Sequence, residues 1–304
     1  MEPQHSVPTF QRLKGQETEP QTAWDDITDE SEAGSSCQVI GFTGAKGGVG
    51  TTTVALNVAM ALVQAGQKVI YVELSPQLAT ASWMLQMPQT LALRDSLVRL
   101  DDINRDYVAK LLMQHSTGIE VLCLSPWAQE VGSPVSTELF AALLRELKGL
   151  ADYVVLDFPL EPSFSSMLFL SHCHILDLVM ETDSLCLALA KKQVEFIQSQ
   201  CTTSILFTPV NRSGIPPADG LQGIQDHVGC EVPVLIPPAH ELCHTAGIKR
   251  LPIVCINPNS VPALQFVKLS ERLLGSFQED GSEATRNRRG NDRRKTDRRD
   301  RGGW

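Results

Sequence analysis

Short apolar runs alternate with longer amphipathic stretches through most of the chain, from about residue 38 to residue 277. Several short runs are apolar without a break, as in Tyr153-Val154-Val155-Leu156. Strands covered on both faces, as in a parallel sheet between two layers of helices, have this composition. The pattern predicts strands over 38–43, 68–74, 119–124, 152–157, 174–180, 203–208 and 232–236. It predicts helices over 52–65, 77–86, 104–115, 136–149, 183–199, 220–227 and 260–277. We therefore expect an α/β domain with a doubly wound, mostly parallel sheet and helices on both faces.

The alternation is missing at both ends of the chain. Residues 1–36 are rich in acidic and small polar residues, and the segment Arg286–Arg301 is strongly basic. Neither composition can bury enough apolar surface to offset the entropy of ordering the chain. We expect an acidic disordered leader over 1–36, a folded domain over 37–278 and a basic disordered tail over 279–304. The leader is either plainly solvated or carries a short docking motif at Trp24–Ile27.

Composition narrows the class of protein. The chain has 304 residues, of which 42 % are hydrophobic, enough for one substantial core. A net charge of −9 argues against a globally basic surface for nucleic acid. The eight cysteines are dispersed, and the first 36 residues lack the apolar segment of a signal peptide. We therefore expect reduced thiols in a cytoplasmic protein, with no membrane-spanning helix.

A glycine-rich segment joins the first predicted strand to the first predicted helix. Its glycines let the backbone curl so that N–H groups point inward, and the helix N-terminus adds a partial positive charge. Lys46 supplies a counter-charge for phosphate, and the Thr52 hydroxyl is a candidate Mg²⁺ ligand. The alternative is an ordinary glycine turn between a strand and a helix. The candidate nucleotide-binding residues here are Gly44, Ala45, Lys46, Gly47, Gly48, Val49, Gly50, Thr51, Thr52 and Thr53.

The predicted strand over 152–157 ends in Asp157. A carboxylate at the carboxyl end of an apolar strand, close to a phosphate loop, is placed to hold Mg²⁺. Asp157 and Thr52 are thus the candidate metal ligands. The alternative role for Asp157 is a simple cap at the end of the strand.

The loop resembles the deviant Walker A motif of the MinD/ParA family of P-loop ATPases. Gly44 and Gly50 have the family spacing and Lys46 matches its early lysine, but Thr51 stands where the family has a second lysine. The resemblance implies a P-loop fold with ATP and Mg²⁺ as ligands. It also implies a homodimer in which Lys46 reaches the phosphates of the partner. Lys46 and Asp157 would then be the catalytic residues.

Three further segments resemble motifs of the same family. The segment Val69–Gln77 resembles switch I, with Glu73 and Ser75 in place of two aspartates. Ser75 stands where the family activates the attacking water, and a serine cannot accept its proton at neutral pH; alternatively, Ser75 only caps the next helix. The segment Thr208–Arg212 resembles the family element whose asparagine, here Asn211, reads the adenine edge; alternatively, it is a simple loop after a strand. The segment Val234–Pro238 resembles a further family strand, so Arg212 and Pro237 are also candidate nucleotide-binding residues. Ala239 or His240 occupies the position of an aspartate that usually follows the proline.

Since Thr51 and Ser75 replace two charged family residues, we expect slow or absent ATP hydrolysis. Removing a single preorganised charge of this kind costs about 10²–10³ in rate.

Within the family, the chain is most similar to the CpaE/TadZ branch of localisation factors for pilus assembly. The segments Leu93–Leu97 and Gly118–Leu122 carry this likeness. A threonine-containing loop also occurs in the BcsQ branch, which is linked to cellulose synthesis. The implied partners are proteins of a pilus, secretion or cellulose machine. The alternative is an active MinD/ParA-type ATPase in division-site selection or DNA partitioning.

The basic tail leaves several options open. Residues Arg286–Arg301 could bind an anionic membrane surface, at about 1 kcal/mol per basic residue. They could equally bind nucleic acid or the acidic leader, or remain solvated. A peripheral position at the inner face of the plasma membrane is therefore one option for a cytoplasmic protein of this kind.

Overall fold

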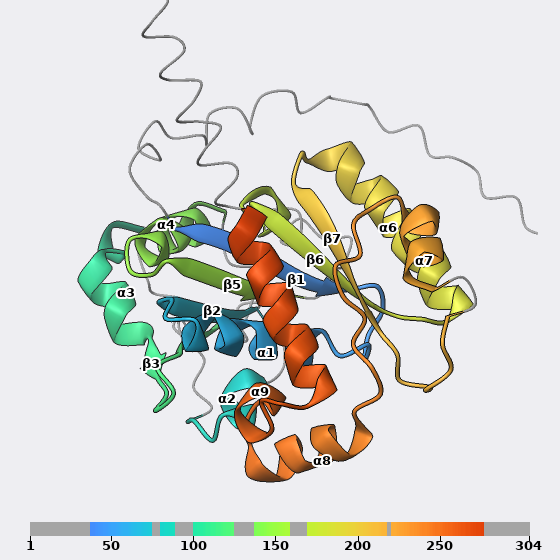
Figure 1. Cartoon of the computed structure of the whole chain (residues 1–304). Coiled ribbons are helices and arrows are strands. Elements are labelled where there is room, and N and C mark those ends of the chain that lie inside the picture. The colour runs from blue at the N-terminus through green and yellow to red at the C-terminus, as the bar shows by residue number, and fades with distance from the viewer. Residues whose placement is uncertain are drawn as a thin grey trace, which may run out of the picture. The chain divides into compact units, whose positions relative to one another are not determined.

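The computed structural model describes residues 37–74, 80–88, 100–124, 137–158, 169–217 and 220–276. These residues form a seven-stranded sheet with the order β3-β4-β2-β5-β1-β6-β7 (Figure 1). Every pairing is parallel except that of β3 with β4 at one edge. The predicted fold class, a mostly parallel α/β sheet of the P-loop type, is confirmed. The strands are β1 (Gln38–Gly44), β2 (Val69–Leu74), β3 (Met113–Gln114), β4 (Glu120–Leu124), β5 (Tyr153–Asp157), β6 (Ile175–Glu181) and β7 (Ser204–Val210).

Helices lie against the sheet and at its edges. In Figure 1 the last helix, over 261–276 and drawn in red, crosses the near side of the sheet, while α6 and α7 lie beside β7. None of the helices in the described part of the chain combines the length and apolar composition needed to cross a bilayer. The labelled helices are α1 (Thr51–Gln64), α2 (Thr80–Met84), α3 (Arg105–Leu111), α4 (Thr137–Lys148), α6 (Ser184–Gln200), α7 (Gly220–Val228), α8 (His240–Lys249) and α9 (Ile253–Ile256), with a 3₁₀ turn η2 (Leu100–Asp102).

The first helix, α1, is deeply packed and directly follows the glycine-rich segment. All residues from Val54 to Leu62 are buried. Burying a valine or leucine side chain contributes about 1.5–3 kcal/mol, so this apolar helix is fixed firmly against the sheet. Because α1 begins directly after the glycine loop, its packing fixes where the loop ends.

One predicted strand was wrong, and one predicted helix is shorter than expected. The segment 232–236 is not a strand: isolated bridges join Ile236, and Glu231 just before the segment, to β7. Pro233 lacks the N–H that a continuous ladder requires. The helix predicted over 104–115 ends at Leu111, because the chain turns extended at Leu112 and forms β3.

The helix α8 was not predicted at all. Its sequence, HELCHTAGIK, has little amphipathic periodicity and includes Gly247, so local pattern gave no signal for it. The segment also lies within a region that we expected to be loop. This omission matters because α8 borders the candidate site.

Candidate nucleotide-binding site

The glycine loop has a conformation that only some residues can adopt. Gly48 and Gly50 have φ values of 80° and 100°, in the left-handed region that favours glycine. Gly44 is required by space: a Cβ there would lie 2.5 Å from Thr51 Oγ1 and 2.9 Å from Val49 Cγ2. The loop is therefore built around glycine at both of its ends.

The N-terminus of α1 lies at the end of the glycine loop and has no side-chain cap. Gly50 is the N-cap residue and offers no side chain to the first N–H groups of the helix. The first turn also contains no acidic residue. Unpaired N–H groups and the helix dipole together favour an anion at this position.

Asp157 lies next to the loop, as predicted. It is the last residue of β5, and its register partner on β1 is Phe42. Its Oδ2 accepts a hydrogen bond from the Tyr71 hydroxyl at 2.7 Å. Burial raises the pKa of Asp157, whereas hydrogen bonds from Thr52 and Tyr71 lower it. The two candidate metal ligands, Thr52 and Asp157, are thus brought together.

Glu73 performs a different task in the neighbouring strand. Its two carboxylate oxygens accept hydrogen bonds from the backbone N–H groups of Thr80 and Ala81, at 2.8 and 2.9 Å. Burial raises the pKa of Glu73 to about 7. The two hydrogen bonds from Glu73 fix the start of α2. Ser75, the other substituted position in this segment, lies outside the described residues.

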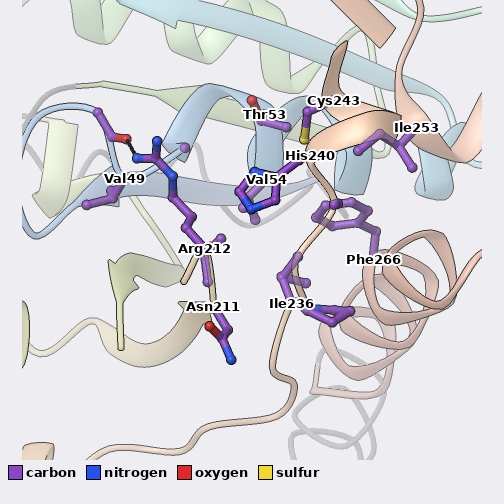
Figure 2. Close-up of a pocket in the computed structure, with 15 residues that line it drawn as sticks. Val49, Thr53, Val54, Asn211, Arg212, Ile236, His240, Cys243, Ile253 and Phe266 are labelled. Carbon is purple, nitrogen blue, oxygen red and sulfur yellow. Dashed lines mark hydrogen bonds between the residues drawn. The ribbon is translucent and has the colours of Figure 1, made fainter. Parts of the chain in front are cut away.

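Lys46 is held by acidic side chains at the end of β6 and just beyond it. Its Nζ lies 3.1 Å from Glu181 Oε2 and 4.0 Å from Asp183 Oδ2. Arg212 donates from Nη1 to the other oxygen of Glu181, at 2.7 Å. The same Nη1 donates to the carbonyl oxygen of Gly48, at 2.9 Å. Arg212 thus lies across the loop, as Figure 2 shows.

The loop is also fixed from α6. Gln193 Nε2 donates to the carbonyl oxygen of Ala45 at 3.0 Å, and Ala45 N–H donates to Val179 O of β6 at 2.9 Å. Both backbone polar groups of Ala45 are therefore hydrogen-bonded, and this fixes the chain just before Lys46. Gln193 was not among the predicted site residues.

A pocket of about 300 Å³ adjoins the loop. This volume is at the lower end of the range usual for small-molecule sites. Figure 2 shows the residues that surround the pocket, which come from the loop, α1, the end of β7, the 236–243 segment, α9 and the last helix. The lining is mostly apolar, as a nucleobase requires, with a few polar groups. It consists of Gly48, Val49, Gly50, Thr53, Val54, Val210, Asn211, Arg212, Ile236, Pro237, Ala239, His240, Cys243, Ile253 and Phe266.

Asn211 lines the pocket, but its amide is largely occupied by its own loop. The oxygen Oδ1 accepts from Gly214 N–H at 2.9 Å and from the Ser213 hydroxyl at 3.3 Å. The nitrogen Nδ2 donates to Ile215 O at 3.1 Å. An amide has two N–H donors, so one remains for a ligand among the described contacts. A role for Asn211 in reading adenine therefore stays a prediction.

The sequence-based prediction missed the residue that joins α1 to α9. Asn57 is buried; its Nδ2 donates to Thr53 O at 2.8 Å, and its Oδ1 accepts from Val254 N–H at 3.1 Å. These bonds place α9, and with it Ile253, at the pocket. The signal was an asparagine inside an apolar helix, a position that usually requires a specific partner.

The sequence comparisons agree with this geometry. A family model described as an AAA domain matches residues 37–181. The chain is similar to a putative septum site-determining protein MinD of Emiliania huxleyi, with 22 % identity over 249 residues that cover 80 % of this chain and 89 % of that protein.

Solved structures show the same fold. A ParA family ATPase of Chlorobium tepidum has a TM-score of 0.68 at 19 % identity, over 79 % of this chain and 100 % of that one. MinD of Pyrococcus horikoshii, solved with Mg-ADP, has a TM-score of 0.61 at 22 % identity, over 78 % of this chain and 96 % of that one. The chain therefore has the fold of these MinD and ParA family proteins.

Proposed function

We propose that the protein binds ATP with Mg²⁺ and uses the nucleotide to form a dimer through Lys46. One observation carries this proposal: the glycine loop and the open N-terminus of α1 adjoin an apolar pocket large enough for a base. Phosphates would lie against the loop and the N–H groups of α1. The base would enter the pocket between Pro237 and the start of α1.

The residues beside the loop fit Mg²⁺. This ion prefers carboxylate and hydroxyl oxygens together with phosphate oxygens and water. Asp157 and Thr52 supply the first two, and the Tyr71 hydroxyl holds the carboxylate in place. Bound Mg²⁺ would neutralise phosphate charge; Asp157 and Thr52 would hold it at the end of β5. The Mg-ADP complex of the Pyrococcus protein is consistent with this assignment.

We propose that hydrolysis is weak or absent. Position 51 carries threonine, and position 75 carries serine, which cannot act as a base at neutral pH. Binding depends on other groups, namely the loop amides, Lys46, Thr52 and Asp157, and so it should persist. The protein would then act as a nucleotide-dependent switch whose state is read by a partner.

The proposed role of this switch is to position another assembly in the cell. The likeness to the CpaE/TadZ branch favours a pilus or secretion machine, and the likeness to the BcsQ branch favours a cellulose machine. The second candidate function is an active MinD/ParA-type ATPase in division-site selection or DNA partitioning, favoured by the similarity to MinD and ParA proteins. Rapid phosphate release that Asp157→Ala abolishes would favour this second function.

The solution mass with and without Mg·ATP tests the proposal. We expect a shift from the 33.3 kDa protomer to twice that mass when ATP is added. Lys46→Ala should bind nucleotide and remain a monomer, since its lysine cannot reach the partner's phosphates. Lys191→Ala, a change to an exposed lysine on α6, is the matched control and should dimerise normally. A mass that does not respond to ATP would contradict the proposed switch.

A further inference from the structure

Glu181 occupies the centre of the charged network at the loop. Each of its carboxylate oxygens contacts a different cation: Oε2 lies 3.1 Å from Lys46 Nζ, and Oε1 lies 2.7 Å from Arg212 Nη1. Its side chain is 20 % exposed, against 36 % for Lys46 and 58 % for Arg212. The carboxylate is therefore the inner member of the network.

The sheet holds Glu181 in this position. It is the last residue of β6, and it pairs in register with Val210 of β7. Two residues earlier, Val179 accepts the backbone hydrogen bond from Ala45. The carboxylate thus projects from a rigid strand end rather than from a mobile loop, and it lies beside the segment that carries Lys46.

The cationic side chains near the loop are few. Among the described residues of the loop and pocket lining, Lys46 and Arg212 are the cationic side chains. Position 51, directly after Gly50, is a threonine. A nucleotide phosphate that approaches the loop therefore meets cations that already face carboxylates: both contact Glu181, and Asp183 Oδ2 lies 4.0 Å from Lys46 Nζ. The hydrogen bond to Glu181 is also the main reason that the pKa of Lys46 is raised.

We propose that Glu181 is an internal counter-ion that competes with nucleotide phosphates for Lys46 and Arg212. This inference rests on the proposed function and adds a residue that sets the affinity of the site. Lys46 must leave Glu181 before it can reach a phosphate of its own or of a partner subunit. The carboxylate therefore weakens nucleotide binding and raises the ATP concentration at which the dimer forms.

Glu181 could instead help nucleotide binding, and the two roles predict opposite changes in affinity. If Glu181 only positioned the two cations for phosphate, removing its charge would weaken binding. Competition predicts tighter binding, so the sign of the change separates the two roles. Because the ion pairs are partly exposed, we expect a modest change, roughly three- to tenfold.

The experiment is a calorimetric titration of the full chain with Mg·ADP, which measures binding to the protomer. Glu181→Gln keeps the size of the side chain and removes its charge, and it should bind Mg·ADP roughly three- to tenfold more tightly. Glu195→Gln, which removes an exposed carboxylate on α6, controls for the change in net charge and should match the wild type. Circular dichroism and denaturant midpoints establish that each variant is folded.

A second set of variants tests whether the effect runs through the two cations. In a chain that already carries Lys46→Gln and Arg212→Gln, adding Glu181→Gln should change the affinity by less than about twofold. Glu181→Asp, which keeps the charge, should bind no more than slightly more tightly than the wild type. Unchanged or weaker binding by folded Glu181→Gln would overturn the inference and leave the proposed function standing. Failure of the wild type and all variants to bind Mg·ADP would overturn both.

Discussion

Asp157 and Asp177 lie at the same level of the sheet, on opposite sides of β1. Phe42 is the register partner of both, so the two carboxylates belong to one row across β5, β1 and β6. Each accepts a hydrogen bond from a hydroxyl of the next strand outward: Tyr71 at 2.7 Å for Asp157, and Thr208 at 2.8 Å for Asp177. Both are buried, and burial raises the pKa of both.

The difference between them is where their strands end. β5 ends at Asp157, which reaches Thr52 at the start of α1. β6 continues to Glu181, so Asp177 stays inside the sheet, and its Oδ1 has no hydrogen-bond partner among the described residues. A buried carboxylate with a raised pKa is therefore not enough to identify a functional site. Its position relative to the glycine loop is what makes Asp157, and not Asp177, the candidate metal ligand.

The largest expected difference between Asp157 and Asp177 is in the effect of Mg²⁺ on nucleotide affinity. Asp157→Asn removes the charge that we assign to Mg²⁺, so the gain in nucleotide affinity on adding Mg²⁺ should fall on the order of tenfold or more. Asp177→Asn is the matched control and should retain that gain. Titrations with ADP in the presence of Mg²⁺ or EDTA measure both. Equal loss in the two variants would show that the row of carboxylates acts through the fold alone.

A smaller expected effect is the contribution of Asp177 to the pH dependence of stability. Burial raises the pKa of Asp177 to about 7, far above the value of an unfolded aspartate, about 4. Between these pH values the folded protein binds more protons than the unfolded chain, so the contribution of Asp177 to stability falls as the pH rises from about 4 to 7. The loss amounts to roughly 1–4 kcal/mol.

Asp177→Asn cannot ionise and should lack this contribution to the pH dependence. Its free energy of unfolding should therefore improve relative to the wild type as the pH is raised through the same window. Urea unfolding of both proteins at several pH values measures the difference. A constant difference between them from pH 4 to 8 would contradict the assigned titration of Asp177.

Local sequence pattern predicted the parts of the site that are contiguous in the chain. The loop from Gly44 to Thr53 and the strand end at Asp157 have clear signatures, because glycine geometry and strand periodicity act over a few residues. The strand predicted over 232–236 failed where Pro233 interrupts an otherwise apolar run.

The remaining site residues depend on contacts between distant parts of the chain. Glu181 meets Arg212, Gln193 meets Ala45, and Asn57 meets Val254, and no local spacing announces such pairs. The helix α8 was also not predicted, because its amphipathic periodicity is weak and a helix of this kind depends on tertiary packing for its stability. Side chains that lie far apart in sequence therefore surround a candidate site whose glycine loop and Asp157 could be predicted from the sequence.

The central claim is that the loop and the adjoining pocket form one nucleotide site. Calorimetric titration of the wild-type chain with Mg·ADP tests it most directly. The account predicts saturable binding at one site per protomer. Absence of binding, or binding that does not depend on the loop, as shown by an unchanged affinity in Gly44→Val, would contradict it.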